Sequence, residues 1–188
     1  MPPSSDPRAR LVEAAGRLFQ RRGYHGSGLT EILAVANAPK GSFYHYFPGG
    51  KAQLAGEAVR AAGAEIATMI EAAFADAADF ADGAARLGAI VGDWFRASDY
   101  REGCPVVQVL LETTPDDAAL AAVCRAVLDD WQARTAAQGE RLGLTADIAD
   151  ARASLLVMGL EGAWIVSRAR RDVAPFARAA AMAATARL

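Results

Sequence analysis

Alanine is the residue that most constrains this chain: about 45 of its 188 residues are alanine, close to a quarter. Alanine has the highest helix propensity of the amino acids, but its single methyl group contributes little to a hydrophobic core. Runs of valine, isoleucine, threonine and tyrosine, which favour strands, are missing. The composition therefore predicts an all-α protein and argues against an all-β or a parallel α/β fold.

Helical periodicity divides the chain into segments separated by glycine, proline and short polar turns. The first segment begins at Asp6-Pro7, an N-cap followed by proline at the first helical position, and it ends at Gly23. A Pro-Gly-Gly sequence at residues 48–50 separates three short helices from a longer body, and residues 1–5 are expected to be a mobile arm. We expect helices over about residues 7–22, 29–37, 39–47, 51–75, 80–98, 104–114, 116–140, 146–170 and 174–187.

The length suits one domain or two small ones. We expect a three-helix domain over residues 1–50 and a helical bundle over residues 51–188. No uncharged apolar stretch of ~18 residues and no signal-peptide pattern is present, so we expect a soluble cytoplasmic protein with no membrane contact. The two cysteines, Cys104 and Cys124, form no CxxC pair, and we expect neither a metal site nor a cofactor.

Charge is distributed unevenly along the chain, although the formal net charge is only −2. Residues 1–51 contain seven basic and three acidic residues, a net charge of +4, whereas residues 52–188 contain 13 basic and 19 acidic residues, a net charge of −6. Both lysines and both histidines lie in the first 51 residues. A basic first quarter favours an anionic partner, although a short segment can also reach this charge by chance composition.

Two short helices joined by a tight turn, as expected over residues 28–47, form a helix-turn-helix, whose second helix can enter the major groove of DNA. That second helix has the sequence KGSFYHYF. Phe43 and Phe47 are expected to point into the three-helix core, which leaves polar side chains on the other face to bond phosphates or base edges. Gly41 lets the start of the helix approach DNA closely. A short polar helix is, however, also common on ordinary protein surfaces.

A longer stretch makes the pattern specific. Residues 23–54, GYHGSGLTEILAVANAPKGSFYHYFPGGKAQL, resemble the DNA-binding signature of the TetR/AcrR family of bacterial transcriptional regulators. The matching features are, in order, Gly23-Tyr24, Ile32, Lys40-Gly41, Phe43-Tyr44, Phe47, Lys51 and Leu54.

The sequence also departs from the family pattern. Gly28 stands where threonine is frequent, Asn37-Ala38-Pro39 stands where Gly-Val-Ser is frequent, and Tyr46 stands where histidine is frequent. The loop before Lys51 is one residue longer than usual. Together with Gly103-Cys104-Pro105-Val106, the stretch is similar to the LmrA/YxaF-type subgroup.

The resemblance implies a homodimer whose two reading helices enter successive major grooves, ~34–36 Å apart, of a roughly palindromic double-stranded operator. Because residue 28 is a glycine, one expected phosphate contact is in doubt, and neighbouring hydroxyl groups are expected to replace it. The candidate DNA contacts are Lys40 and Ser42 for bases, Gly41 for close approach, and Ser27, Thr30, Tyr44, His45 and Lys51 for phosphates.

The body has few large apolar residues among many alanines and glycines, so its helices either pack closely or enclose space. The resemblance implies an effector site there, and such a lining favours a flat, apolar or aromatic ligand. The candidate lining residues are Met69, Phe74, Trp94, Phe95, Val107, Leu110, Leu111, Trp131 and Met158, with Gln108 and Glu112 either as polar contacts or as residues that face solvent.

One face near the C-terminus combines apolar and small residues. The resemblance implies that this face and the last alanine-rich helix form the dimer interface. Glu161 within this segment is either an intersubunit contact or a rim residue. The candidate interface residues are Leu155, Leu156, Gly159, Gly162, Ala163 and Val166.

We expect a one-component transcriptional repressor that binds its operator as a dimer and is released by a small apolar or aromatic ligand. An enzyme is not expected, because both histidines adjoin the reading helix and no nucleophile–base arrangement is present. Cys104, before a proline at a helix start, is interpreted as a packing residue or as a redox sensor. Two alternatives stay open: a helical ligand-binding or scaffold dimer without DNA binding, and a nucleoid-type DNA-binding protein without a sensor.

Overall fold

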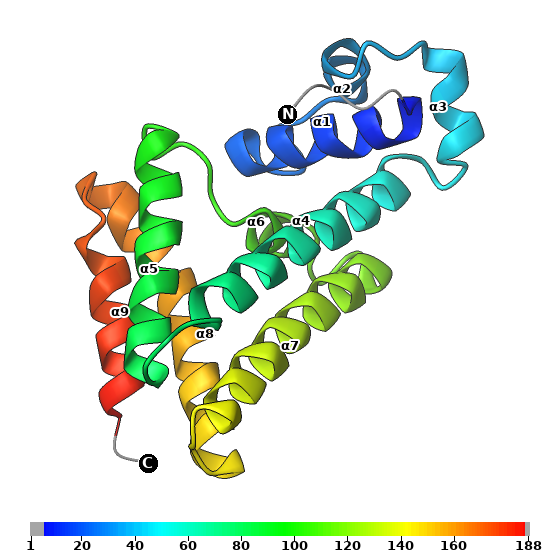
Figure 1. Ribbon diagram of the computed structural model, residues 1–188. Helices are drawn as coiled ribbons and strands as arrows, with labels where there is room; N and C mark the ends of the chain where they lie inside the picture. The colour runs from blue at the N-terminus through cyan, green and yellow to red at the C-terminus, as the bar shows by residue number, and fades with distance from the viewer. Residues whose placement is uncertain (1–5, 187–188) are drawn as a thin grey trace. The chain divides into compact units, whose positions relative to one another are not determined.

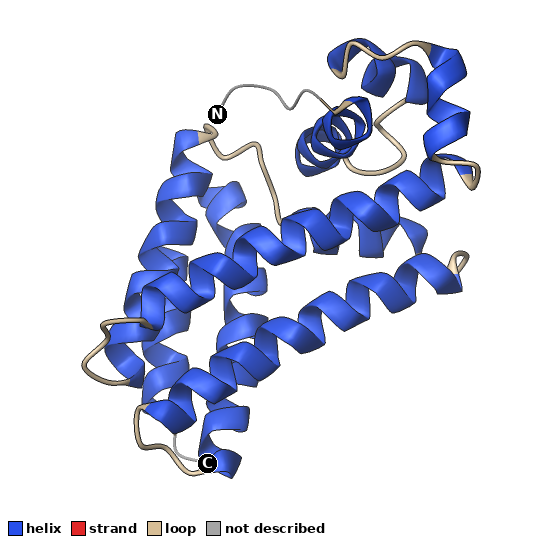
Figure 2. Ribbon diagram, turned by 45° about the vertical axis from the view of Figure 1, so that its right-hand side comes forward, coloured by secondary structure: helices blue, strands red, loops and turns tan. Residues whose placement is uncertain are grey.

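The computed structural model describes residues 6–186, so the arm expected over residues 1–5 lies outside the described residues. Within this range the chain forms helices and no strand, which confirms the all-α fold (Figures 1 and 2). No helix in the same range is long and apolar enough to span a membrane. The helices are α1 (Pro7–Arg22), α2 (Leu29–Val35), α3 (Lys40–Tyr46), α4 (Gly50–Phe74), α5 (Phe80–Ala97), α6 (Pro105–Thr113), α7 (Ala118–Arg141), α8 (Ala146–Arg170) and α9 (Ala174–Thr185).

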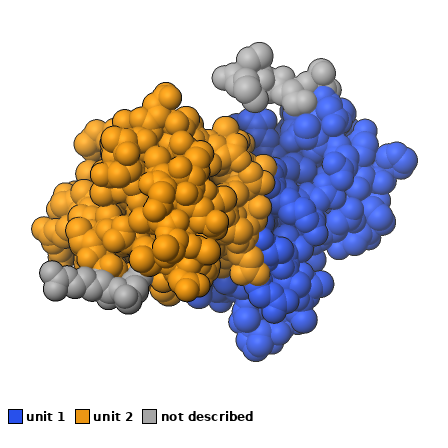
Figure 3. All heavy atoms as spheres, turned by 60° about the horizontal axis from the view of Figure 1, so that its bottom comes forward, with its two compact units in different colours: residues 1–63, 102–127 blue, residues 64–101, 128–188 orange. Residues whose placement is uncertain are grey.

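These helices form two compact units, which Figure 3 shows in different colours. Unit 1 comprises residues 1–63 and 102–127, and unit 2 comprises residues 64–101 and 128–188, each as far as it is described. The long helices α4 and α7 each contribute their first part to unit 1 and their second part to unit 2, and α6 belongs to unit 1. The compact units are defined by contacts within the chain and do not show where one function ends and another begins. The predicted functional division at residue 50 therefore stays a prediction.

Helix α1 begins and ends as the sequence predicts. The carboxylate of Asp6 accepts a hydrogen bond from the Arg8 amide at 3.0 Å, and Pro7 is the first helical residue. At the other end Gly23 donates its N–H to the Phe19 carbonyl at 2.9 Å. Gly23 has φ 75° and ψ 177°, an extended conformation with positive φ that is essentially restricted to glycine. It therefore turns the chain out of α1 in an extended conformation and not as a left-handed helical cap.

In unit 1, the first three helices pack around aromatic and aliphatic side chains. Phe43 and Phe47 are completely buried, and their rings stack with a centroid distance of 5.5 Å, which confirms the predicted inner face of α3. Ile32 of α2 is completely buried as well. The Arg10 Nε atom donates to the Ala36 carbonyl at 3.1 Å and so ties α1 to the end of α2.

The first parts of α4 and α7 approach each other closely in unit 1 because α4 carries glycine where α7 carries branched side chains. A Cβ atom placed on Gly63 would lie 2.6 Å from Val127, closer than real Cβ contacts allow. One placed on Gly56, two helical turns earlier, would lie 3.8 Å from Leu120. The absence of a side chain at Gly63 therefore sets the separation of the two helices.

In unit 2, α5, α8 and α9 pack over small residues. A Cβ atom placed on Gly88 of α5 would lie 3.1 Å from the Phe176 carbonyl oxygen and 3.3 Å from the Ala180 side chain of α9. One placed on Gly159 of α8 would lie 3.1 Å from Ala179 of α9. For these contacts, the small residues allow close packing of the backbones.

The same unit contains a cluster of aromatic rings. Phe95 lies 4.6 Å from Trp164, and Trp164 lies 5.2 Å from Phe176, each measured between ring centroids and each edge-to-face. Trp94 joins the cluster 5.7 Å from Trp164, also edge-to-face. Edge-to-face aromatic pairs contribute about 0.5–1.5 kcal/mol beyond the burial of their area. The cluster thus holds α5, α8 and α9 together.

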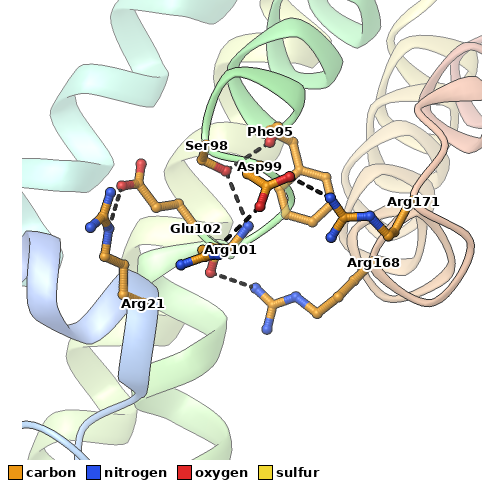
Figure 4. A network of polar contacts seen from close by, with 8 residues as sticks. All are labelled: Arg21, Phe95, Ser98, Asp99, Arg101, Glu102, Arg168 and Arg171. Carbon is orange, nitrogen blue, oxygen red and sulfur yellow. Dashed lines mark hydrogen bonds and ion pairs between the residues drawn. The ribbon is translucent and has the colours of Figure 1, made fainter.

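The loop after α5 carries two consecutive residues with positive φ, Asp99 at 55° and Tyr100 at 60°. Non-glycine residues in this region cost about 1–3 kcal/mol each, so the surrounding contacts must hold them in place. Figure 4 shows these contacts: the Asp99 carboxylate accepts a hydrogen bond from Arg171 and pairs with Arg101 at 3.4 Å, and Arg168 donates to the Arg101 carbonyl at 3.1 Å. The hydrogen bond from Arg171 lowers the pKa of Asp99, which keeps the carboxylate charged.

Candidate nucleic-acid interface

Helices α2 and α3 are joined by a closed turn. Asn37 adopts a φ of 48°, and the Ala38 N–H donates to the Leu33 carbonyl at 3.0 Å. Asparagine tolerates this left-handed region better than most residues, so it can end a helix in place of glycine. Pro39 then precedes α3 in an extended conformation. The result is a helix-turn-helix, as predicted.

The outward face of α3 carries an exposed cation, an exposed aromatic ring and an exposed imidazole. Lys40 and His45 are exposed, and Tyr44 is 53% exposed while its ring packs edge-on against Phe43 at 5.1 Å. A Cβ atom placed on Gly41 would meet nothing within 4 Å, so no internal contact requires glycine there. This face is accessible, and its glycine leaves room for a partner to approach the backbone.

The three candidate hydroxyl groups differ in accessibility. Thr30 is exposed on α2. Ser27 is completely buried, and its Oγ atom donates to the Gly23 carbonyl at 2.7 Å, which argues against the predicted phosphate contact. Ser42 is partly exposed, and its hydroxyl donates to the Pro39 carbonyl at 2.8 Å, so only its acceptor positions stay available.

Lys51, the other candidate phosphate contact, is bound inside unit 1. Its Nζ atom donates to the Tyr24 carbonyl at 2.6 Å and lies 4.2 Å from the centroid of the Tyr24 ring. Burial lowers the pKa of Lys51, and the nearby charge of Glu112 opposes this effect. In this arrangement the ammonium group holds the turn after α1, so a contact with phosphate requires its release.

Most of the positive charge of the first helices is paired within unit 1. Arg10 and Lys51 bond backbone carbonyls, as described above, which leaves Lys40 as the one cation of residues 6–51 without a bonding partner in the described chain. The net charge of +4 overstates the local charge, because Arg8 and Arg21 pair with Glu57 and Glu102, which lie outside residues 1–51. The ion pairs are Arg8–Glu57 at 2.5 Å, Arg17–Glu13 at 2.7 Å, Arg21–Glu102 at 2.8 Å and Arg22–Glu31 at 2.5 Å.

Comparison with known proteins gives matches along most of the chain. Residues 11–58 match the profile of bacterial regulatory proteins of the tetR family, and residues 81–182 match the C-terminal domain of LmrA/YxaF-like transcriptional regulators. The chain belongs to the TetR family. An HTH-type transcriptional regulator of Mycobacterium tuberculosis is 36% identical over 178 residues, which cover 90% of this chain and 88% of that protein. The HTH-type transcriptional regulator LmrA of Bacillus subtilis is 31% identical over 170 residues, 90% of each chain.

Solved structures agree with this assignment. A TetR regulatory protein from Rhodobacter sphaeroides superposes with a TM-score of 0.80 at 28% identity, covering 93% of this chain and 95% of that one. A TetR regulator from Legionella pneumophila shares the fold with a TM-score of 0.83 at 13% identity, covering 96% of this chain and 97% of that one. This TetR-family regulator therefore carries a DNA-binding helix-turn-helix, and its family consists of regulators rather than enzymes.

In this TetR-family regulator the candidate effector residues are divided between the two units. Leu111 is 71% exposed and Met158 is 60% exposed, whereas Phe74 and Phe95 are completely buried. The candidates on α6 in unit 1 are Val107, Gln108, Leu110, Leu111 and Glu112. The candidates in unit 2 are Met69, Phe74, Trp94, Phe95, Trp131 and Met158.

The two polar candidates on α6 hold the end of α1. Gln108 Nε2 donates to the Gln20 carbonyl at 3.0 Å, and Glu112 Oε2 accepts from the His25 amide at 2.6 Å. Neither role was among the sequence interpretations, which were a ligand contact or a solvent-facing residue. The bonded residues lie 88 and 87 positions apart, so local periodicity carries no signal for them.

The candidate dimer face of the TetR-family regulator forms a shallow groove of about 770 Å³ between α8 and α9. Five of the six candidates line it, and the sixth, Leu156, is completely buried inside unit 2. The sequence did not single out Arg170, Arg178 and Met182, which also line the groove. The five candidates that line it are Leu155, Gly159, Gly162, Ala163 and Val166.

Both cysteines are buried. Cys104 precedes α6 and is 4% exposed, whereas a redox sensor needs an accessible thiolate. Burial raises the pKa of Cys124 to about 11. The structure therefore favours packing roles for both side chains. Among residues 6–186, no group of three or more His, Cys, Asp or Glu side chains is arranged to hold a metal ion.

Proposed function

We propose that this TetR-family regulator is a repressor that binds a palindromic operator as a homodimer through α3 and is released by a small apolar or aromatic effector. The observation that carries the proposal is the outward face of α3. Lys40 is exposed and unpaired, Tyr44 and His45 of the same helix are exposed, and Gly41 leaves the backbone open. Lys40 and Ser42 read bases, whereas Thr30, Tyr44 and His45 bind phosphates.

Homodimerisation is supported by the apolar groove between α8 and α9. Met158 is 60% exposed and Met182 is 71% exposed, both line this groove, and large contiguous apolar patches are rare on monomeric soluble proteins. A second copy of the same face buries both residues in a two-fold interface. Operator binding by such a dimer requires its two α3 helices to match two half-sites, ~34–36 Å apart.

An aromatic or apolar effector is supported by the aromatic cluster of unit 2. Within the cluster Trp94 is partly exposed and Phe95 is buried, and the candidates Met69, partly exposed, and Trp131, buried, belong to the same unit. Rings and thioethers of this kind bind flat apolar molecules by stacking and by edge contacts. The effector lowers operator affinity by favouring a conformation in which the two α3 helices no longer match successive grooves.

The experiment is selection of binding sequences from a random duplex library, followed by affinity measurements at several salt concentrations. We expect a palindromic motif, and we expect Lys40→Ala to weaken binding and to lower the salt slope by about 1. Arg125→Ala is the matched control, because Arg125 is an exposed cation of α7 in the same unit. No enriched motif, or equal effects of the two substitutions, would contradict operator binding by α3.

The effector is tested with a panel of small aromatic compounds on the complex of the wild-type protein with its selected duplex. Compounds that raise the melting temperature of the protein are expected to release the duplex as well, because binding and release share one conformational equilibrium. A panel in which the binding compounds leave duplex affinity unchanged would contradict the effector part alone.

A further inference from the structure

The carboxylate of Glu112 occupies a space that exists only because residue 23 is a glycine. A Cβ atom placed on Gly23 would lie 1.7 Å from Glu112 Oε1 and 2.6 Å from its Cδ atom. The positive φ of Gly23 requires glycine independently of this space. The turn after α1 and the end of α6 thus fit each other, and we call residues 23–25 the carboxylate seat.

Hydrogen bonds hold Glu112 in the seat. The His25 amide donates to Glu112 Oε2 at 2.6 Å, and His25 Nε2 lies 2.8 Å from the Glu112 carbonyl oxygen. A carbonyl oxygen only accepts, so Nε2 carries the proton in this contact. Hydrogen bonds to a charged acceptor are shorter and roughly twice as strong as neutral ones. Both the side chain and the backbone of Glu112 therefore bind the seat.

Residues that precede Glu112 in the chain contact the last turn of α1. Gln108, about one helical turn before Glu112, donates to the Gln20 carbonyl at 3.0 Å, and the Gly103 amide donates to the same oxygen at 3.0 Å. Glu102 pairs with Arg21 at 2.8 Å, as Figure 4 shows. Four residues of the segment 102–112 thus contact the end of α1 or the seat, and all of these residues belong to unit 1.

The seat is also held from α4. Lys51 donates to the Tyr24 carbonyl at 2.6 Å and covers the Tyr24 ring. The charge of Glu112 acts on the ammonium group of Lys51, so the two side chains that hold the turn stabilise each other. Inside the turn, the buried Ser27 hydroxyl bonds the Gly23 carbonyl, and α2 begins two residues later. A displacement of the seat is therefore passed directly to the start of the helix-turn-helix.

We propose that Glu112 is a positioning residue for DNA recognition, whose carboxylate on the seat fixes α2 and α3 in the orientation that binds the operator. This inference rests on the proposed function, because the orientation matters only if α3 binds DNA. It adds a specific contact between the end of α6 and the turn that precedes the helix-turn-helix. When α6 moves away, the seat loses two hydrogen bonds and the charge that faces Lys51.

The first test follows the seat without DNA, by NMR and amide hydrogen exchange of the full chain. Glu112→Ala is expected to remove the downfield shift of the His25 amide proton and to speed its exchange about tenfold. In the same variant, amide exchange over residues 29–46 is expected to become faster, whereas amide exchange over α5 stays unchanged. Glu112→Gln still offers an oxygen acceptor, so its amide shift and exchange rate are expected to lie between those of the wild-type protein and of Glu112→Ala. Asp116→Ala is the control, since Asp116 is an exposed carboxylate of unit 1 with no bond to the seat.

The second test measures affinity for a duplex selected with the wild-type protein. Glu112→Ala is expected to weaken binding about tenfold, Glu112→Gln to weaken it less, and Asp116→Ala to leave it unchanged. If the contact served only global stability, its loss would lower the melting temperature in the same order of variants. The affinity of the folded protein for the duplex would then stay unchanged. Glu112→Gln keeps the size of the side chain, so it decides the question if Glu112→Ala fails to fold.

Two results overturn the inference. One is an unchanged His25 amide in Glu112→Ala, and the other is equal duplex affinity of Glu112→Ala and Asp116→Ala while the wild-type protein binds. A wild-type protein that enriches no duplex overturns the proposed function itself and the role of Glu112 with it. The behaviour of the wild-type protein in the selection thus distinguishes the two failures.

Discussion

At Gly41, the second residue of α3, we expect helix stability and DNA binding to make opposite demands on the side chain. Glycine in a helix costs up to ~1 kcal/mol relative to alanine, and nothing inside the chain lies within 4 Å of an added methyl group. Gly41→Ala is therefore expected to raise the free energy of unfolding by a few tenths to ~1 kcal/mol and to weaken operator binding. Urea titration and fluorescence anisotropy with a selected duplex measure the two effects.

Gly16→Ala is the matched control for Gly41→Ala. Gly16 lies inside α1, and an added Cβ atom there also meets nothing within 4 Å. It is expected to stabilise the protein similarly while leaving duplex affinity unchanged. If Gly41→Ala binds the duplex with the affinity of the wild-type protein, the prediction that DNA approaches the start of α3 closely is wrong.

Single residues also show what sequence alone does not reveal about the interface. The pattern around Lys40 and Tyr44 predicted an outward face of α3, because Phe43 and Phe47 share the opposite face of one helix. Ser27 looked equally available, yet its hydroxyl is buried and bonds the Gly23 carbonyl. Burial of this kind depends on how the turn packs, and no spacing along the sequence encodes it.

The helices themselves were predicted to within a few residues, and the differences have local causes. α7 was expected from about residue 116, after Pro115, but it begins at Ala118 because Asp117 accepts a hydrogen bond from the Leu120 amide at 2.9 Å. α2 ends at Val35 because the following turn uses a left-handed Asn37. Caps and turns of this type depend on backbone conformations that many sequences can adopt, so the sequence does not fix them. The spacing of apolar residues along a helix does not depend on such a conformation, and it predicts the helix more reliably.

The pairing of α4 with α7 gives a prediction for a whole element. Gly63→Ala gains helix propensity but places a methyl group 2.6 Å from Val127, and overpacking typically costs about 1–3 kcal/mol. We expect a net loss of unfolding free energy in urea titration. Val127→Ala is expected to remove the penalty of Gly63→Ala in the double mutant, because it opens the same space. An additive double mutant would show that the contact does not limit the approach of the helices.

For the molecule as a whole, the sequence predicted the order of helices but not their partition into units. The sequence predicts that α6 belongs to the effector-binding body, because the periodicity of a short apolar helix does not identify its partners. The structure places it in unit 1, where Gln108 and Glu112 bond residues more than 80 positions away. Contacts over such separations depend on how the folded chain packs, and the pattern of a single sequence does not specify them.

The apolar face of α8 and α9 leads to a prediction about assembly. Met182 is 71% exposed in the groove that most of the candidate interface residues line. In the proposed dimer this side chain is buried, so Met182→Glu places a charge where no water reaches it. We expect light scattering behind size-exclusion chromatography to show a monomer in place of the wild-type dimer. Duplex affinity is expected to fall as well, because one α3 helix contacts only half of the operator.

Ile90→Glu separates loss of the interface from a general effect of a surface charge. Ile90 is 38% exposed on α5 and does not line the groove, so this variant is expected to remain a dimer with unchanged duplex affinity. A dimer that survives Met182→Glu but dissociates with Ile90→Glu would place the two-fold contact on α5. Dissociation by Met182→Glu alone would tie operator binding to the α8–α9 face, because a palindromic site binds tightly only when both reading helices engage it together.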